Sequence, residues 1–279
     1  MKNIVFVADF FADQVLGGGE LNNEELIKII TQQKHSIEKI NSHLLTKEYV
    51  QQNRDAKFII ANFVNVPFDV VREMYDKEYI IYEHDHKYLS TRNPGMFPDF
   101  VAPKESIINL EFYQKAKAVL CQSKFHVEIV HKNTHLNNLV NLGGNIWDMD
   151  SLKFMKTQAD VEKNQKYAIM NSNIPHKNTI GSIRFCNAKS YDYTLIESQD
   201  YKSFLQLMGA NKSLVFMPQT PETLSRVVVE ARMMNMGVVT NKMIGARTEP
   251  WYSLKGHKLI EIMKNKRKEI TDTVLENLR

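Results

Sequence analysis

Short apolar runs alternate with amphipathic segments along the first half of the chain. The first run, residues 4–8, stops at Asp9 and contains no polar position, which is typical of a strand buried on both faces. Further predicted strands lie near 35–45 and at 58–61, 79–82 and 118–121, and predicted helices lie at 110–117 and 124–131. Apolar strands that alternate with helices predict a parallel sheet covered on both faces.

The same alternation restarts after a polar stretch at 153–166. Predicted strands at 167–170, 193–196, 214–217 and 238–240 alternate with predicted helices at 179–185, 201–208 and 225–234. Residues 258–278 carry apolar side chains at helical spacing, which predicts an amphipathic C-terminal helix. We place a domain boundary near 140, and therefore predict domains at 1–140 and 141–255 followed by a helix at 256–279.

The predicted fold class is α/β, with two Rossmann-like domains that face each other across a cleft. In such sheets, ligands bind beyond the carboxyl ends of the strands, so two facing edges would form one deep site. The C-terminal helix has a basic face at Lys264, Lys266, Arg267 and Lys268. We expect that face to brace the first domain or to be solvated, and contact with a membrane surface is the alternative.

Composition narrows the class of protein and its compartment. The 279 residues are 43% hydrophobic and 10% aromatic, as in a globular protein of one or two domains. The net charge of +4 suits anionic partners, but no basic stripe with interleaved aromatics is visible, so nucleic acid is not expected. Cys121 and Cys186 form no disulfide framework, and no apolar run suits a signal peptide or a membrane span. We expect a cytoplasmic protein.

Gly17, Gly18 and Gly19 follow the first predicted strand and precede a helix that the pattern starts at Asn22-Asn23. Glycines at such a place let backbone N–H groups approach a phosphate, and the helix dipole favours the anion. The spacing is neither that of a dinucleotide fingerprint nor that of a Walker A loop. The alternative is a tight turn that needs positive φ.

His84-Asp85-His86 follows the fourth predicted strand and could supply a general base, hydrogen bonds to a substrate, or metal ligands. No third ligand with suitable spacing is visible, so no metal site is predicted, and a solvated loop end is the alternative. Asp148-Met149-Asp150 has the D-x-D form by which some nucleotide-sugar enzymes hold a divalent metal. Its place in the apparent linker favours a solvated helix start instead.

The second half offers one lysine and two acids beside predicted strand ends. Lys177 lies next to a helix N-terminus, where a cation is poorly placed unless an anion lies between them, and a surface lysine is the alternative. Glu222 follows the strand at 214–217, and seven residues separate it from Glu230 on the next helix, which Thr223 or Ser225 could cap. The spacing of the acids alone also fits one solvated and one paired acid.

In context, these residues resemble the signature of the retaining two-domain (GT-B) glycosyltransferases of the large group-1 class, family four. That family has a Pro-Ser-x-x-Glu loop followed by Glu-Ala, and this chain has Pro218-Gln219-Thr220-Pro221-Glu222 and then Glu230-Ala231 at the same spacing. The signature covers about 60 residues strongly, and the architecture covers the whole chain.

The resemblance implies a role for each matching residue. Glu230 would accept hydrogen bonds from the ribose of a nucleotide sugar, Glu222 would lie beside the transferred sugar, and Lys177 would neutralise the diphosphate. The amides of Thr223, Leu224 and Ser225 would lie along the diphosphate and the sugar, and Glu197 and Ser198 would lie near the base. In the first domain, Gly17–Gly19 and His84 would contact the donor and the acceptor.

Four departures from the family pattern are visible, of which two replace the glycine after the helix with Asn235 and the following proline with Gly237. The family's arginine in the first loop of the second domain is Asn173 here, and its glycine-rich turn is Thr223-Leu224-Ser225. We predict a retaining, metal-independent glycosyltransferase without a cofactor, which uses a nucleoside-diphosphate-sugar donor and a glycan, lipid-linked or small-molecule acceptor. The departures keep two alternatives open, a non-catalytic module that binds nucleotide sugars or glycans and a nucleotide-sugar epimerase.

Overall fold

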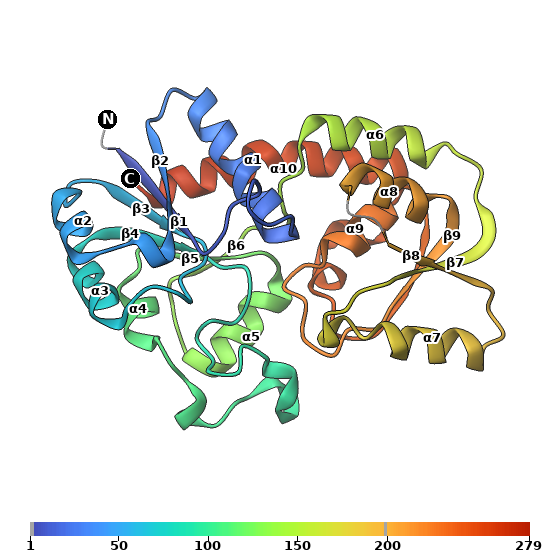
Figure 1. Cartoon of the computed structure of the whole chain (residues 1–279), viewed down its shortest axis with the longest axis horizontal. Coiled ribbons are helices and arrows are strands. Elements are labelled where there is room, and N and C mark those ends of the chain that lie inside the picture. Colours follow the sequence, from blue (N-terminus) through green and yellow to red (C-terminus); the bar gives the residue numbers. More distant parts are fainter. Residues whose placement is uncertain (1–2, 198–199) are drawn as a thin grey trace. The chain divides into compact units, whose positions relative to one another are not determined.

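The computed structural model describes residues 3–197 and 200–279, which form two compact units (Figure 1). The first unit extends to Ile146 and includes Lys266–Arg279, and the second comprises Trp147–Asn265. The sequence placed the boundary near residue 140, whereas the structure divides the chain after Ile146. The reason is that Leu142 and Ile146 pack into a core of the first unit.

The first unit is a six-stranded parallel sheet with the strand order β2-β1-β3-β4-β5-β6. Its strands are β1 (Ile4–Ala8), β2 (Ile37–Asn41), β3 (Lys57–Ile60), β4 (Glu78–Tyr82), β5 (Val119–Cys121) and β6 (Leu139–Asn141). Its helices are α1 (Gly18–Gln32), α2 (Lys47–Gln52), α3 (Phe68–Glu73), α4 (Leu110–Lys115) and α5 (Lys124–Thr134). The sequence pattern did not locate β6, α2 and α3, although it located β5 and α4, which have the same lengths.

Successive residues of β1 enter two different cores, which explains why this strand has no polar position. Val5 and Val7 pack in one core with residues of α2, α3, α4 and α5. Phe6 and Ala8 pack in the other core with residues of α1 and of the C-terminal helix. Side chains alternate between the faces of a strand, and both faces of this sheet are covered by helices, so the strand is apolar throughout.

The second unit is a four-stranded parallel sheet with the order β10-β9-β7-β8. Its strands are β7 (Asn164–Met170), β8 (Tyr193–Ile196), β9 (Asn211–Phe216) and β10 (Gly237–Thr240). Its helices are α6 (Met149–Ala159), α7 (Thr179–Ala188), α8 (Tyr201–Gly209) and α9 (Arg226–Met233). The larger core packs α6, α8 and α9 on one face of the sheet, and the smaller core packs α7 on the other.

The C-terminal helix α10 (Gly256–Asn277) contributes to the cores of both units. Leu259 and Met263 pack in the second unit, and Ile270 and Val274 pack in the first. Within the first unit, Arg267 of the expected basic face forms an ion pair of 2.7 Å with Glu25 of α1. This half of α10 therefore braces the first unit through both apolar and charged contacts.

Three local expectations need correction. Helix α1 begins at Gly18 rather than at Asn22, because Gly17 is extended and serves as the N-cap residue. Asp148 is the N-cap of α6 and accepts a hydrogen bond from the Ser151 amide, so the stretch after 153 that looked like a polar linker begins within a helix. Ser225 precedes α9 but makes no capping hydrogen bond with its side chain.

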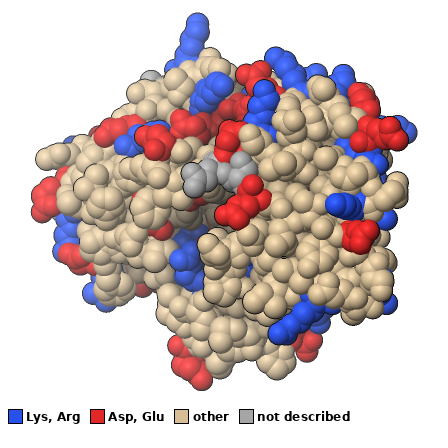
Figure 2. All heavy atoms as spheres, turned by 45° about the vertical axis from the view of Figure 1, so that its right-hand side comes forward, with Lys and Arg blue, Asp and Glu red and all other residues tan. Residues whose placement is uncertain are grey.

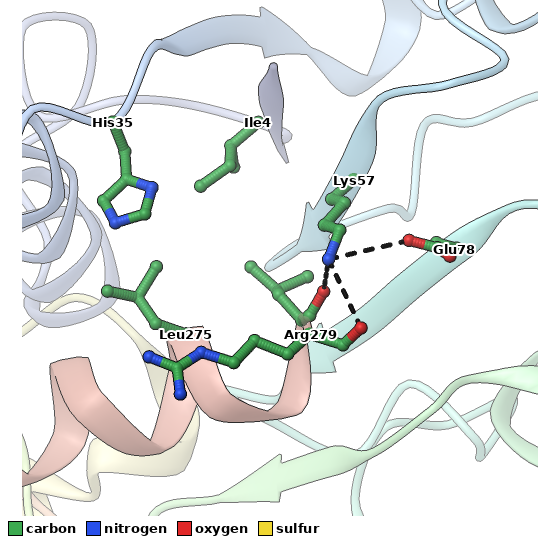
Figure 3. A pocket seen from close by; sticks show the side chains of 7 residues that line it. Ile4, His35, Lys57, Glu78, Leu275 and Arg279 are labelled. Carbon is green, nitrogen blue, oxygen red and sulfur yellow. Dashed lines mark hydrogen bonds and ion pairs between the residues drawn. The ribbon is translucent and has the colours of Figure 1, made fainter. Parts of the chain in front are cut away.

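A cavity of about 670 Å³ lies at the amino-terminal edge of the first sheet (Figure 3). Ile4, Lys57 and Glu78, the first residues of three strands, line it together with the end of α10. The Lys57 ammonium donates to the Leu278 carbonyl, so this cavity belongs to the docking of α10. Among the described residues, no helix is both long and apolar enough to cross a bilayer.

Candidate functional site

The strand order of the second sheet defines where its loops diverge. In the order β10-β9-β7-β8, strand β8 lies on one side of β7 and strand β10 lies on the opposite side of β9. The connections that leave β7 and β9 therefore run in opposite directions. Loops that leave neighbouring parallel strands in opposite directions open a crevice at the carboxyl edge, which is where ligands bind in such sheets. Lys177 follows β7 and Glu222 follows β9, so both predicted residues lie at this point.

The side chains of Lys177 and Glu222 form an ion pair with 2.7 Å between Nζ and Oε1. Their exposed fractions are 24% and 14%, so the pair is partly buried but reachable from solvent. The Glu222 backbone is fixed on both sides, because its amide donates to the Met243 carbonyl and its carbonyl accepts from the Gly245 amide. The sequence named both residues but did not predict that they would pair.

Glu230 is 3% exposed and lies within a set of protein donors. Its Oε1 accepts hydrogen bonds from Trp147 Nε1 at 2.9 Å and from the Tyr201 hydroxyl at 2.6 Å. Arg226, one helical turn earlier, forms an ion pair of 3.5 Å with the same oxygen and stacks over the Trp147 ring at 4.4 Å. Burial and the charge of Glu230 raise the pKa of Tyr201 well above its ordinary value.

Sequence reasoning missed Trp147, Tyr201 and Arg226. The spacing of four residues between Arg226 and Glu230 was the available signal, because such pairs lie on one face of a helix. No local pattern could have indicated Trp147 or Tyr201, since these donors approach Glu230 from distant segments of the chain.

At the turn 223–225, the structure explains the departure from glycine at Leu224 but not at Ser225. Leu224 is fully buried in the larger core of the second unit, where a glycine would leave a void. Ser225 has φ 77° and ψ 86°, a left-handed conformation that favours glycine. Its hydroxyl is buried and has no hydrogen-bond partner.

The remaining residues predicted for the second unit lie in the loops after β7 and β8. Asn173 is exposed in the loop after β7. Glu197 directly follows β8 and accepts a hydrogen bond of 2.8 Å from the Asn171 side chain. Ser198 lies outside the described residues.

The first sheet diverges in the same way between β1 and β3, because β2 lies on one side of β1 and β4 lies beyond β3. Asp9, directly after β1, spans this point. Its carboxylate accepts hydrogen bonds from the amides of Val64 and Asn65 after β3, and from the Ser42 hydroxyl after β2. One acid thus joins the loops that follow three strands.

The three glycines lie at the start of α1, beside this crevice. The Glu20 carboxylate folds back so closely that a Cβ on Gly17 would collide with it. Burial raises the pKa of Glu20 above its ordinary value, a hydrogen bond to its own amide offsets part of that effect, and the charges of Asp9 and Asp85 add to it. The N-terminus of α1 therefore already has a carboxylate beside it, which the sequence did not predict.

His84 lies against the first turn of α1, close to the three glycines. A Cβ on Gly19 would lie 3.7 Å from the imidazole ring. Nε2 faces the Asn23 side-chain oxygen at 2.5 Å, and Nδ1 faces the Gln122 amide nitrogen at 2.5 Å. These contacts fix the orientation of the ring.

A buried ionic cluster follows β4. The Lys87 ammonium contacts Glu83 at 2.5 Å and Asp85 at 2.9 Å, and Arg92 forms a second ion pair with Asp85. Glu83 also accepts a hydrogen bond from the Tyr113 hydroxyl. Burial raises the pKa of Glu83, whereas the charges of Lys87 and Arg92 outweigh burial at Asp85 and hold its pKa below the ordinary value.

Among the described residues, the charged side chains show no grouping that indicates a metal site. Within residues 3–197 and 200–279, no group of three or more His, Cys, Asp or Glu side chains could hold a metal ion. On the face that Figure 2 shows, basic and acidic side chains lie interspersed rather than in one basic stripe.

Comparison with known proteins yields solved structures only. No protein-family model matches the chain, and no curated protein matches it by sequence. HepE of Anabaena in complex with UDP and glucose is similar over 100% of this chain and 94% of its own, with 14% identity and a TM-score of 0.54. The same protein with UDP-glucose is similar over 98% and 94%, with 13% identity and a TM-score of 0.52.

A second similar structure is an alpha-glucosyltransferase in complex with UDP and a 13-mer DNA. It is similar over 96% of this chain and 90% of its own, with 12% identity and a TM-score of 0.52. Two parallel sheets covered by helices match the two Rossmann-like domains expected from the sequence. The chain has the two-domain GT-B fold of these glycosyltransferases.

Proposed function

We propose that this protein is a glycosyltransferase that moves a sugar from a nucleoside-diphosphate donor to an acceptor hydroxyl, with retention of configuration and without a metal ion. The observation that carries the proposal is the pair of Lys177 and Glu222 at the crevice of the second sheet. The similar structures that contain UDP make a uridine donor the first to test.

The ion pair suggests how the donor is recognised. Without a ligand, Glu222 neutralises Lys177, so an entering diphosphate has to compete with the carboxylate for the ammonium. A diphosphate carries more charge than a carboxylate, and charge-assisted hydrogen bonds to phosphate are strong. We propose that Lys177 turns to the diphosphate, and that Glu222 is released to accept hydrogen bonds from the sugar.

The charge that develops on the leaving diphosphate needs stabilisation. Lys177 supplies a positive charge, and the N-terminus of α9 supplies the positive end of a helix dipole close to Glu222 in the chain. The buried Ser225 hydroxyl adds a donor that has no protein partner. These groups support a mechanism in which a metal ion is not needed and in which the acceptor attacks the face that the diphosphate leaves.

Two further roles are proposed for residues that already have protein partners. Glu230 is proposed to face the ribose, although Trp147, Tyr201 and Arg226 already engage its Oε1, so a ribose has to reach the other oxygen or displace a donor. His84 is proposed to face the acceptor, where a hydroxyl that displaces Gln122 would donate to Nδ1.

The first experiment measures binding of UDP and UDP-glucose by calorimetry, followed by release of glucose from UDP-glucose. We expect Lys177→Ala to weaken UDP binding about 10- to 100-fold, the range for loss of a hydrogen bond to a charged group. Glu222→Gln leaves Lys177 unpaired, so we expect UDP to bind at least as tightly while turnover falls. Lys153→Ala is the matched control, because Lys153 is an exposed lysine of the same unit paired with Asp150.

The outcomes separate the alternatives. If the wild-type protein binds none of UDP, GDP and ADP or their sugars, the proposal is wrong. Binding without hydrolysis or transfer would favour a non-catalytic module, and conversion of one nucleotide sugar into another would favour an epimerase. Activity that persists with a chelator, and an α-linked product from UDP-α-glucose, would support metal independence and retention.

A further inference from the structure

The exposed apolar side chains of the first unit are not scattered. Among the described residues of that unit, each large exposed hydrophobic side chain lies in a segment that connects the carboxyl end of a strand to the next α-helix, or on the first residue of that helix. They are Phe10, Val15, Leu16, Leu44, Val64, Phe68, Met96, Val101 and Ile108. A parallel sheet brings all of these segments to one edge, the edge that also carries His84.

Three of these side chains surround a pocket of about 260 Å³ between the loops that follow β3 and β4. Val64, Phe68 and Ile108 line it with exposed fractions of 49%, 63% and 40%. Phe63 and Leu89 line its inner part and are buried. An engineered apolar cavity of about 150 Å³ holds benzene, so this pocket has room for one ring or a short alkyl chain but not for a whole substrate.

Backbone hydrogen bonds hold both walls of the pocket in place. On the β4 side, the Ile108 amide donates to the Tyr88 carbonyl at 2.8 Å, and the Ser90 amide donates to the Ser106 carbonyl at 3.0 Å. On the β3 side, the Asp9 carboxylate accepts from the amides of Val64 and Asn65. A pocket with fixed walls does not have to be ordered when a ligand binds, which lowers the cost of binding.

The pocket has a polar side as well, formed by Lys87, Ser90 and Arg92. Lys87 and Arg92 also hold the two carboxylate oxygens of Asp85, the residue next to His84. A ligand with its apolar part in the pocket therefore has charged and hydrogen-bonding groups beside it in the direction of Asp85. Such an arrangement suits an amphipathic molecule rather than a purely polar one.

The geometry points to an acceptor with an apolar alkyl or aryl group, which docks in this pocket and leaves its sugar or hydroxyl portion at the edge that carries His84. This inference rests on the proposed function, because it names the class of acceptor that the first unit takes. A bilayer surface is a less suitable occupant, because a flat membrane accepts protruding side chains whereas a pocket accepts a group that enters it.

The test uses calorimetric titration of the full chain with n-alkyl glucosides from ethyl to hexyl, in the presence of UDP. We expect the Kd to fall about two- to fourfold for each added methylene, since complete burial of one methylene is worth about 0.8 kcal/mol. Ile108→Asp and Phe68→Ala should flatten this dependence. Leu44→Ala is the matched control, because Leu44 is exposed at the same edge but does not line the pocket.

UDP binding in the same titrations distinguishes the two proposals. Normal UDP binding with a Kd that does not depend on alkyl length would overturn the inference and leave the proposed function standing. Alkyl dependence that Ile108→Asp abolishes, with no UDP binding, would support the pocket and overturn the proposed function.

If Ile108→Asp instead abolishes sedimentation with phosphatidylglycerol vesicles and alkyl glucosides show no dependence, the edge contacts membranes and the inference is wrong. Thermal unfolding of each variant shows whether it has folded.

Discussion

Ser225 is the residue at which the sequence and the backbone conflict most clearly. Its φ of 77° is costly for any residue with a Cβ, and its buried hydroxyl has no partner. The strained position lies between Glu222 and α9, where the proposed donor site requires close approach of the backbone. Strained residues are found where function holds them in place, so the observation supports a ligand at this turn.

Ser225→Gly is expected to stabilise the protein. Glycine adopts positive φ without steric cost, whereas a residue with a Cβ pays about 1–2 kcal/mol. We expect the free energy of unfolding in urea to be about 1 kcal/mol higher for Ser225→Gly than for Ser225→Ala, because both variants lose the hydroxyl and only one loses the strain. Equal stability of the two variants would show that the backbone here is not strained.

The acid at position 230 was predicted from its spacing to Glu222, and its surroundings could not be predicted. Its Oε1 accepts from Trp147 at the start of the second unit and from Tyr201 on α8, both far away in sequence. A sequence pattern can indicate that a carboxylate lies on a helix face. It cannot indicate which distant donors satisfy that carboxylate, because those contacts depend on tertiary packing.

At the level of elements, the segment after β4 carries both a buried ionic cluster and His84. Glu83, Asp85 and Lys87 form a cluster in which Lys87 is 2% and Glu83 0% exposed, and the same segment carries His84. A buried charge is tolerated only when it is paired. The cluster therefore fixes the backbone on either side of His84, while the His84 ring contacts α1 and Gln122.

Lys87→Met is expected to lower the free energy of unfolding by about 3–5 kcal/mol at pH 7, because it leaves the buried Glu83 without its cationic partner and Asp85 with Arg92 alone. The pKa of Asp85 is held well below its ordinary value by the charges of Lys87 and Arg92, so the stability from its pairing is fully present above that ordinary value and falls progressively as the pH drops below it. The difference in free energy of unfolding between the wild type and Lys87→Met should therefore be smaller at pH 3 than at pH 7. Urea unfolding at the two pH values measures it.

A second substitution serves as the control for this prediction. Glu83→Gln in the Lys87→Met background removes one of the charges left unpaired, so it should restore part of the lost stability at pH 7. If the double variant is as unstable as Lys87→Met alone, the loss comes from packing of the lysine chain rather than from the charge.

At the scale of the whole molecule, α10 contributes to the cores of both units. Ile270 is buried in the first unit and Leu259 in the second, although both lie on one continuous helix. We expect Ile270→Ala to cost about 2–5 kcal/mol and to lower hydrogen-exchange protection mainly in β1, β3 and β4. Leu259→Ala should act mainly on β7 and β9.

Lys258→Ala is the control on the same helix, because Lys258 is exposed and lies next to Leu259. It should leave protection in both units unchanged. If each buried substitution lowers protection equally in both sheets, the two units unfold as one cooperative body rather than separately.

The alternation of strands and helices, the two parallel sheets, and the position of Lys177 and Glu222 after strands of the second sheet all follow from the sequence alone. These features depend on local hydrophobic period and on spacing, which are visible in a single chain. The sequence pattern misplaced the start of α1, because Asn22 and Asn23 have the composition of a cap but are buried within the helix, where they contact Tyr82 and His84.

The pairing of those residues becomes visible only in the folded structure. The structure showed that Lys177 pairs with Glu222, that Glu230 has three protein partners, and that Glu20 lies against the N-terminus of α1. It also revealed the apolar pocket, whose walls come from loops after two different strands. The physical reason is that strand order, which no local pattern encodes, decides which loop ends meet and therefore which side chains come together.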